Sequence, residues 1–443
     1  MHVSENIPFE IWREIFQIVF ATKSDISHPP SKWEWSPLNS RLNVYRCVAL
    51  VSKVWRENAR AVFFEDLQAL TADALKGLIQ CFHFDKHIAT AVSRVEFSFY
   101  EFRCSMSTPR RPRKLLPPIP GEEEDEITRI RRNKEASYQP SKTTQAKHWD
   151  SWNSYIGFIL KRCSSLAEVK ISFSSDHSAR DRPRTSMNYA TLFKVPDLTI
   201  KNIIESLVSL ENLREVTLID PAPLEKYGPG MAAWERMQSL TIILHRSFEE
   251  LSESSFIPPR SLKSFKFHDH SPGDIAWPLS SDLGRCTNLQ YLNLGVSSLE
   301  NQITVEAIAF LIRAYQNTLL ELTLESVSSD RWHSRTAVEF SQVFARQPPV
   351  HFEKLRTLRF VGGYYDSSIL VGVNNDALAT LEFPRLDYRK HQVDETVWRK
   401  ILCQRNLKGL KKLKIEKMES DVSEVVSKVC EELEIHFELS VKA

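Results

Sequence analysis

Glycine is scarce in this chain, at 12 of 443 residues. A loop that cradles a phosphate needs several closely spaced glycines, and the chain contains neither the GxxxxGKS/T sequence of nucleotide-binding loops nor the GxSxG of serine hydrolases. The zinc-protease sequence HExxH is missing as well. We therefore expect a protein that is not an enzyme and that holds no cofactor.

Cysteine and long apolar runs are also sparse. The cysteines are odd in number and widely spaced, with no CxxC pair, which disfavours a disulfide framework and a zinc site. They are Cys47, Cys81, Cys104, Cys163, Cys286, Cys403 and Cys430. No apolar run approaches the roughly 18 residues that cross a bilayer, and the chain does not begin with a basic-then-apolar signal. We expect reduced thiols and a cytoplasmic or nuclear protein that does not contact a membrane.

The net charge is small, because 58 lysines and arginines face 56 aspartates and glutamates. This balance argues against a general nucleic-acid coat and against a nucleic-acid partner. With 42% hydrophobic and 26% charged residues the composition is that of a globular protein, and the length suffices for one large or two moderate cores.

The first 67 residues carry apolar side chains at helical spacing in two separate halves. Ile7, Ile11 and Ile15 recur in the first half, and Pro8 stands where its missing N–H costs a helix start least. Val51 and Trp55 continue the same spacing in the second half. Short amphipathic helices have little core of their own, so we expect part of this surface to belong to a partner.

The order of these residues resembles the F-box, the helical module that docks its host onto a Skp-type adaptor of a cullin ubiquitin ligase. The first half, Ile7-Pro8-x-Glu10-Ile11-x-x-x-Ile15-Phe16, stands where the family has Leu-Pro-x-Glu-hydrophobic and Ile-Phe. The second half, 48–56, contains the Val-Ser-Lys-x-Trp close. Ile7 replaces the family's leucine, and an insert at 21–40 resembles those of fungal F-box proteins. The resemblance implies adaptor binding by Ile7, Pro8, Ile11, Ile15, Phe16, Leu50, Val51 and Trp55.

One pattern returns along the rest of the chain: apolar, two residues, apolar, one residue, apolar. Its nine copies are Leu166-Val169-Ile171, Leu213-Val216-Leu218, Met237-Leu240-Ile242, Leu262-Phe265-Phe267, Leu289-Leu292-Leu294, Leu319-Leu322-Leu324, Leu355-Leu358-Phe360, Leu378-Leu381-Phe383 and Leu410-Leu413-Ile415. Val92-Val95-Phe97 has the same spacing, and a weak last copy is Cys430-Leu433-Ile435. From Leu213 to Leu410 the starts lie 23 to 36 residues apart, which is typical of a solenoid with connections of unequal length.

This pattern resembles the leucine-rich repeat, in which the apolar residues lie on a short parallel strand and a helix returns the chain. Helical spacing at 199–210, 298–316, 335–347 and 393–404 predicts such returns. The family's asparagine after the strand is missing from every copy, so we expect uneven turns. The predicted fold is α/β: an F-box-like helical module over 1–67, with an irregular leucine-rich-repeat solenoid of parallel strands and helical returns over 68–443.

The segment 104–147 differs from its surroundings, being rich in proline and in charges of both signs. It has few core-forming residues, so we predict a disordered loop inserted in the first repeat. Its basic clusters at 110–114 and 129–134 flank an acidic run, which fits either a nuclear-import or nucleic-acid contact or, as we favour, a solvated loop of mixed charge. A helix over 146–163 follows, with inward-facing Trp149, Trp152, Ile156, Ile159 and Leu160. Another helix is predicted over 71–87.

A metal site is a weak alternative at His268-Asp269-His270, because the pattern supplies no third and fourth ligand. We expect a solvent-facing turn there. The strand residues between the apolar positions are the better candidates for recognition. They are mixed in charge and basic in the later repeats, which suits an acidic or phosphorylated ligand or serves solubility alone. The candidate target-binding residues are Arg214, Lys263, Lys266, Tyr291, Asn293, Arg356, Arg359 and Lys412.

Together these features predict the substrate-recognition subunit of a Skp–cullin–F-box ubiquitin ligase. The expected partners are a Skp-type adaptor, through it a cullin, and a target protein that the sequence does not identify. Two alternatives stay open: a repeat scaffold whose N-terminal helices only cap the solenoid, and an enzyme whose site has no sequence motif.

Overall fold

The structure is a computed structural model of the whole chain. It describes residues 8, 10–12, 14–15, 45–70, 72–98, 142–172, 197–219, 234–244, 259–269, 286, 288–296, 302–326, 350–361, 373–375, 377–385, 395–403, 407–417 and 420–440. The chain forms two compact units, Met1–Leu213 and Arg214–Ala443. Each unit combines helices with a parallel sheet, so the predicted α/β class is confirmed.

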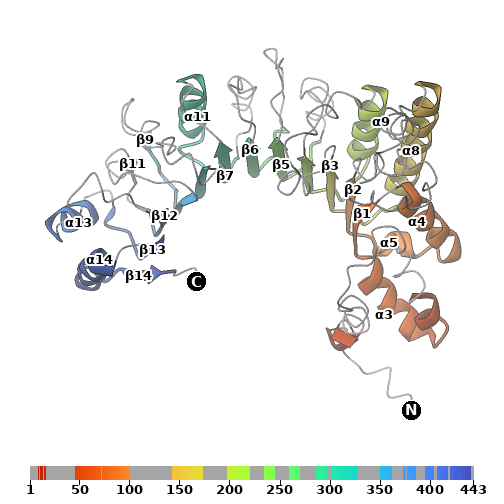
Figure 1. Cartoon of the computed structure of the whole chain (residues 1–443), viewed down its shortest axis with the longest axis horizontal. Helices are drawn as coiled ribbons and strands as arrows, with labels where there is room; N and C mark the ends of the chain where they lie inside the picture. The colour runs from red at the N-terminus through yellow and green to blue at the C-terminus, as the bar shows by residue number, and fades with distance from the viewer. Residues whose placement is uncertain are drawn as a thin grey trace, which may run out of the picture. The chain divides into compact units, whose positions relative to one another are not determined.

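The first unit contains three parallel strands in chain order, β1 (Asp66–Leu70), β2 (Arg94–Ser98) and β3 (Glu168–Ser172). Its helices are α3 (Lys53–Phe64), α4 (Ala72–Phe84), α5 (Ile88–Ala91), α8 (Lys142–Arg162) and α9 (Asp197–Val208), labelled in Figure 1. Residues 10–12, 14–15 and 45–49 are helical as well. The strand β1 begins within the segment that the sequence assigns to the F-box-like module.

Helix α8 packs against α4 and α9 with the face that the sequence predicts. Trp152, Ile156, Ile159 and Leu160 are all buried, whereas the side chain of Trp149 lies outside the described residues. The predicted loop is wrong at its end, because residues 142–147 already belong to α8. They contain lysine, glutamine and alanine and no proline or glycine, so helix propensity extends the helix backward. Residues 104–141 lie outside the described part of the chain.

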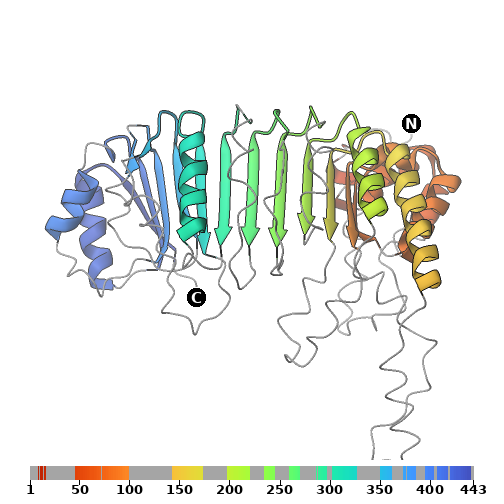
Figure 2. The ribbon, with the colours of Figure 1, turned by 90° about the horizontal axis from the view of Figure 1, so that it is seen from above.

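Among the described residues of the second unit, nine strands form one parallel sheet, in which they lie side by side in chain order with their arrows pointing the same way in Figure 2. They are β4 (Glu215–Ile219), β5 (Ser239–Leu244), β6 (Ser264–Asp269), β7 (Tyr291–Val296), β8 (Glu321–Ser326), β10 (Thr357–Val361), β12 (Thr380–Arg385), β13 (Lys412–Lys417) and β14 (His436–Leu439). Two short strands, β9 (Val350–His351) and β11 (Val373–Asn374), pair separately.

Three helices of the second unit lie on one side of its sheet in Figure 1: α11 (Gln302–Ala314), α13 (Glu395–Leu402) and α14 (Ser420–Glu432). They turn apolar side chains inward, among them Ile308, Ile312, Trp398 and Val426, which are all buried. The helices α9, α11 and α13 fall where the sequence predicts returns. The predicted return over 335–347 lies outside the described residues.

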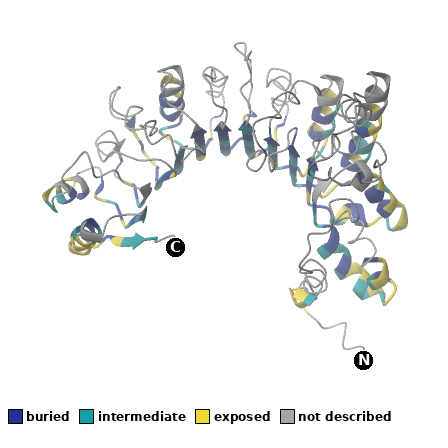
Figure 3. Ribbon diagram, in the orientation of Figure 1, coloured by how far each residue is buried: buried dark blue, intermediate teal, exposed yellow. Residues whose placement is uncertain are grey.

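The nine apolar triplets are the core, and every residue in them is buried. Figure 3 shows the buried residues concentrated along the strands. In the second unit the register places the middle residues of successive triplets opposite one another, as Leu292 opposite Leu322 and Leu358 opposite Leu381. One strand and one return cannot close a core alone, so each repeat completes that of its neighbour.

The prediction of a weak last copy of the pattern at Cys430-Leu433-Ile435 is wrong. Cys430 lies on α14, and Leu433 lies in the turn after it. The register places Phe437 opposite Leu413 and Leu439 opposite Ile415, so these two residues continue the apolar rows. The error arose because Cys430, Val426 and Val422 follow helical spacing, a period that also supplies an apolar residue every third or fourth position.

Polar side chains join successive repeats just before the strands begin. Ser261 Oγ donates to the carbonyl oxygen of Met237 at 2.7 Å, and Thr318 Oγ1 donates to that of Leu289 at 2.7 Å. The buried Asn375 donates through Nδ2 to the carbonyl oxygen of Leu355 at 2.6 Å. Each acceptor is the first residue of the preceding triplet. These bonds link successive repeats, a role that asparagines after the strands have in regular leucine-rich repeats. In this chain the positions after the strands, where such asparagines would stand, lie outside the described residues.

Six cysteines are described as free thiols, and four of them are buried. Burial raises the pKa of Cys81 and of Cys163 to about 12, and that of Cys430 to about 11. These thiols therefore stay protonated and fill the core as small apolar groups.

Among the described residues, no helix has both the length and the apolar character that crossing a bilayer requires.

Candidate functional site

An aromatic contact joins the two halves of the N-terminal motif. The rings of Trp12 and Trp55 meet edge to face, with centroids 5.0 Å apart and planes inclined by 71°. Trp12 is buried, with 2% of its surface exposed. Pro8 begins the first helix, because its carbonyl oxygen accepts the N–H groups of Ile11 and Trp12. Two segments separated by the insert at 21–40 are thereby held together.

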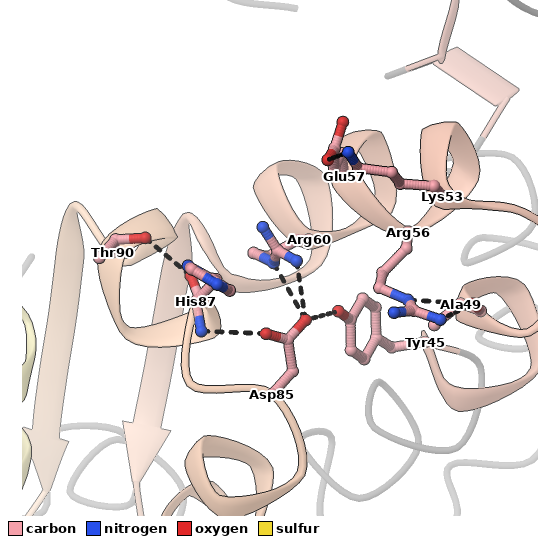
Figure 4. Close-up of polar contacts among 9 residues, drawn as sticks. All are labelled: Tyr45, Ala49, Lys53, Arg56, Glu57, Arg60, Asp85, His87 and Thr90. Atoms are coloured by element: carbon pink, nitrogen blue, oxygen red, sulfur yellow. Dashed lines mark hydrogen bonds and ion pairs between the residues drawn. The ribbon is translucent and has the colours of Figure 1, made fainter.

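The second half of the motif is a turn between two helices, and polar groups fasten it at both ends. Ser52 is the N-cap of α3, where its Oγ accepts the backbone N–H of Trp55 at 3.2 Å. Arg56 donates through Nε and Nη2 to the carbonyl oxygen of Ala49, at 3.2 and 3.1 Å. A cation is favourable there because Ala49 ends the preceding helical segment. Figure 4 shows this contact.

The turn between these caps presents two apolar side chains to solvent. Leu50 is 80% exposed and Val51 is 61% exposed, and Ile11 on the first helix is 44% exposed. Burying a side chain of this size stabilises an association by about 1.5–3 kcal/mol. The segments that Trp12 and Trp55 hold together thus offer apolar surface in a backbone that is already ordered.

The structure separates the eight predicted adaptor-binding residues by their burial. Ile11, Leu50, Val51 and Pro8 are exposed, whereas Ile15 and Trp55 are half-buried. Ile7 and Phe16 lie outside the described residues. Trp12 was not predicted from the sequence. It directly follows Ile11 and widens the apolar face of the same helix, a signal that could have indicated its burial.

A half-buried polar cluster ties the N-terminal helices to the first repeats (Figure 4). The Asp85 carboxylate accepts hydrogen bonds from Tyr45 Oη at 2.6 Å and from Arg60 Nη2 at 2.8 Å. Its other oxygen accepts the backbone N–H of His87 at 2.9 Å. The cluster therefore spans the segment 45–49, α3 and the turn after α4. Nothing in the sequence pattern predicts it, since its members lie 40 and 25 residues apart.

The pKa values within this cluster are shifted. Burial and, next to it, the hydrogen bond to Asp85 raise the pKa of Tyr45 to about 12. Burial alone would raise the pKa of Asp85, but the bonds from Tyr45, His87 and Arg60 outweigh it and hold that pKa below its ordinary value. Asp85 is thus a carboxylate at neutral pH, paired with a guanidinium that is itself mostly buried.

The predicted target-binding residues lie on three neighbouring rows of the second unit. Lys266, Asn293 and Arg359 occupy a register row on the strands, which continues through Glu382, Lys414 and Glu438. Tyr291 and Lys412 begin their strands on the neighbouring row, and Tyr291 is 44% exposed. Arg214, Lys263 and Arg356 stand immediately before β4, β6 and β10.

Three cations on the later strands, Arg359, Lys412 and Lys414, each face a carboxylate. Arg359 lies 3.2 Å from Glu321 and 3.4 Å from Glu382, on the two neighbouring strands. Lys412 and Lys414 both pair with Glu438, at 2.7 and 3.5 Å. The expected basic strand face is therefore offset at these three positions by glutamates of neighbouring strands. Arg359 and Lys412 stabilise the ladder between strands.

The predicted turn at His268 is wrong as well. His268 and Asp269 are the last residues of β6, and His268 is only 5% exposed. Its Nε2 lies 3.0 Å from Asn293 Oδ1 and 3.4 Å from Glu325 Oε2. Glu325 reaches it across Gly295, the residue between them in the register, which has no side chain in the way. Burial raises the pKa of Glu325. No group of three or more potential metal ligands occurs among the described residues.

A scan of the chain against protein-family models gave no match, and a search of curated proteins gave none.

Proposed function

We propose that this protein is the substrate-recognition subunit of a Skp–cullin–F-box ubiquitin ligase. Its N-terminal helices bind the Skp-type adaptor, and its repeats bind the target. The observation that carries the proposal is the exposure of Leu50 and Val51, 80% and 61%, within the motif that resembles the F-box. Apolar residues in a turn capped by Ser52 and Arg56 are more exposed than the fold of this chain requires.

The geometry of the turn suits a docking site. Its backbone is fixed by the N-cap of Ser52 and by the bonds from Arg56 to Ala49. A partner that covers Leu50 and Val51 therefore loses little conformational entropy on binding, so more of the apolar gain appears as affinity. The ubiquitin chemistry takes place on other subunits, and this chain raises the local concentration of the target.

Capture of a purified Skp-type adaptor tests the proposal. We expect the wild-type chain to retain the adaptor and the double variant Leu50→Asp, Val51→Asp to lose it. A matched control is Phe310→Asp on α11, which also replaces an exposed apolar side chain, 48% exposed, but lies in the second unit. The adaptor role is wrong if the wild type retains no more adaptor than the double variant does.

A scaffold without a ligase role is the second candidate, and one observation favours it. The Tyr45–Asp85–Arg60 cluster binds the N-terminal helices to the first repeats, as an end cap of a repeat stack requires. A cap needs this internal contact but has no use for exposed Leu50 and Val51. The double variant Leu50→Asp, Val51→Asp therefore separates the two candidates. If the N-terminal helices are only a cap, the wild type and the double variant should not differ in binding.

A further inference from the structure

In the second unit, one residue immediately before each strand occupies an equivalent position. The carbonyl oxygen of that residue accepts two backbone N–H groups from the next repeat, as Lys263 does from Gln290 and Tyr291, and Arg356 from Ala379 and Thr380. We call this border of the sheet, opposite the arrowheads in Figure 2, the leading edge. From β5 to β13 the residues immediately before the strands are Gln238, Lys263, Gln290, Leu320, Arg356, Ala379 and Lys411.

The leading edge carries cations that form no ion pair with the carboxylates the structure describes. Three repeats each contribute a pair, one just before the first residue of the triplet and one just after it. These residues are Arg260 and Lys263, Lys354 and Arg356, and Lys408 and Lys411, and all six are exposed. Within the described part of the chain their side chains form no ion pair or hydrogen bond. Among the described residues, exposed carboxylates on this edge include Glu235, Glu353 and Glu434.

The contrast with the neighbouring strand face is informative. There, Arg359, Lys412 and Lys414 are committed to Glu321, Glu382 and Glu438. A ligand that recruits those cations has to break existing pairs. A ligand at the leading edge meets cations that form no ion pair within the described part of the chain, so electrostatic attraction is available at this edge.

We propose that the leading edge of the second unit is the target-binding surface and that it takes an extended acidic segment of a protein. The inference rests on the target-binding half of the proposed function. Neighbouring strands lie about 4.8 Å apart, so Lys263 and Arg356 are about 14 Å apart and Arg356 and Lys411 about 10 Å. An extended peptide advances about 3.3 Å per residue, so carboxylates four and then three residues apart match this spacing.

The spacing also decides between an acidic peptide and a nucleic acid. A nucleic-acid strand carries a phosphate about every 3.4 Å of duplex axis, several for each cation pair of this edge. The surplus phosphates would lie against Glu235 and Glu353, which are exposed on the same edge. A peptide can place neutral residues there. The cations are spread along the border and do not converge on one point, which fits distributed carboxylates better than one phosphate group.

Fluorescence anisotropy on the full chain tests the inference. The probe is a labelled peptide of about ten residues, long enough for the span from Lys263 to Lys411, with glutamate at every third position between glycine and serine. The double variant Arg356→Glu, Lys411→Glu is expected to bind it about tenfold more weakly than the wild type, because two attractions become repulsions. The same peptide with glutamine in place of glutamate is expected not to bind.

The control is the double variant Lys161→Glu, Lys400→Glu, whose exposed lysines lie on α8 and α13 and likewise form no pair. It changes the net charge equally and is expected to bind the peptide within about twofold of the wild type. Equal loss in both variants would mean non-specific charge attraction and overturn the site. Tighter binding of a single-stranded oligonucleotide of equal charge would overturn the choice of partner, and a wild type that does not bind the peptide would overturn the inference.

Adaptor capture by the same proteins separates this inference from the proposed function. The variant Arg356→Glu, Lys411→Glu is expected to keep the adaptor, and Leu50→Asp, Val51→Asp is expected to keep the peptide. If the wild type captures the adaptor but does not bind the peptide, only the leading-edge proposal is wrong. If it binds the peptide but captures no adaptor, only the proposed ligase role is wrong.

Discussion

Trp12 meets Trp55 edge to face across the longest interruption of the N-terminal motif, with ring centroids 5.0 Å apart. Edge-to-face pairs of this kind contribute about 0.5–1.5 kcal/mol beyond the apolar area they bury. The contact explains why an insert between the halves is compatible with the motif. The tryptophan pair holds the two halves together, so this task does not fall to the inserted residues.

Replacement of Trp12 by alanine is expected to loosen the N-terminal helices. The loss of a buried aromatic side chain costs about 3 kcal/mol, so the backbone amides of α3 should exchange with deuterium faster. Trp12→Phe keeps a ring at the contact and is expected to lose less than half as much protection. Unchanged exchange in α3 for Trp12→Ala would show that the tryptophan contact does not hold the two halves together.

Replacement of Ser52 by alanine removes the N-cap of α3 and is expected to cost about 1 kcal/mol. The effect should be local, with faster exchange of the Trp55 amide, whose hydrogen bond to Ser52 Oγ is lost. Ser52→Asp supplies another capping oxygen and is expected to restore protection. If the aspartate variant exchanges as fast as the alanine variant, the role of Ser52 is not capping.

Replacement of Asn375 by alanine tests the polar bonds between repeats. Asn375 is fully buried, and it both donates to Leu355 O and accepts the N–H of Ala377 at 2.8 Å. The variant leaves two backbone groups without a partner, which is expected to cost about 2–4 kcal/mol in urea unfolding of the full chain. Asn288→Ala is the control, because Asn288 is exposed just before another triplet. Equal midpoints for both variants would contradict this role.

The repeats could be predicted from the sequence because burial along a strand has a period of two. Each triplet places two apolar residues on one face, and the same spacing in the next repeat puts its apolar residues opposite them, as Leu292 and Leu322. The prediction failed where a helix carried the same residue types, as at Cys430. Apolar spacing does not by itself separate the end of a helix from the start of a strand.

Pairing between polar residues was not predictable from the chain. Arg359 faces Glu321 and Glu382, which lie 38 residues before it and 23 residues after it. The repeats differ in length, so only the register of the strands reveals which charges meet. The same holds for Tyr45, Arg60 and Asp85. It also explains why Arg359 and Lys412 looked available from the sequence, although the register places a carboxylate beside each of them.

The pH dependence of stability should report on Asp85. Its pKa is lowered in the folded chain, so its carboxylate contributes stability that is present above the unfolded pKa of about 3.9 and is lost as pH falls through the folded value. Asp85→Asn removes that charge and leaves Arg60, with 17% of its side chain exposed, without its partner. We expect a loss of about 3 kcal/mol at neutral pH.

Because Asp85→Asn cannot be protonated, the difference between wild type and variant should shrink as the pH is lowered below about 4. Urea unfolding of the full chain over a series of pH values measures this difference. Asp150→Asn is the control, since Asp150 is exposed on α8 and has no pairing partner. Its curve should follow that of the wild type. A gap between wild type and Asp85→Asn that stays constant down to pH values below the folded pKa would mean that Asp85 stabilises the helices by packing and not by its charge, and the ionic link between the N-terminal helices and the first repeats would have to be abandoned.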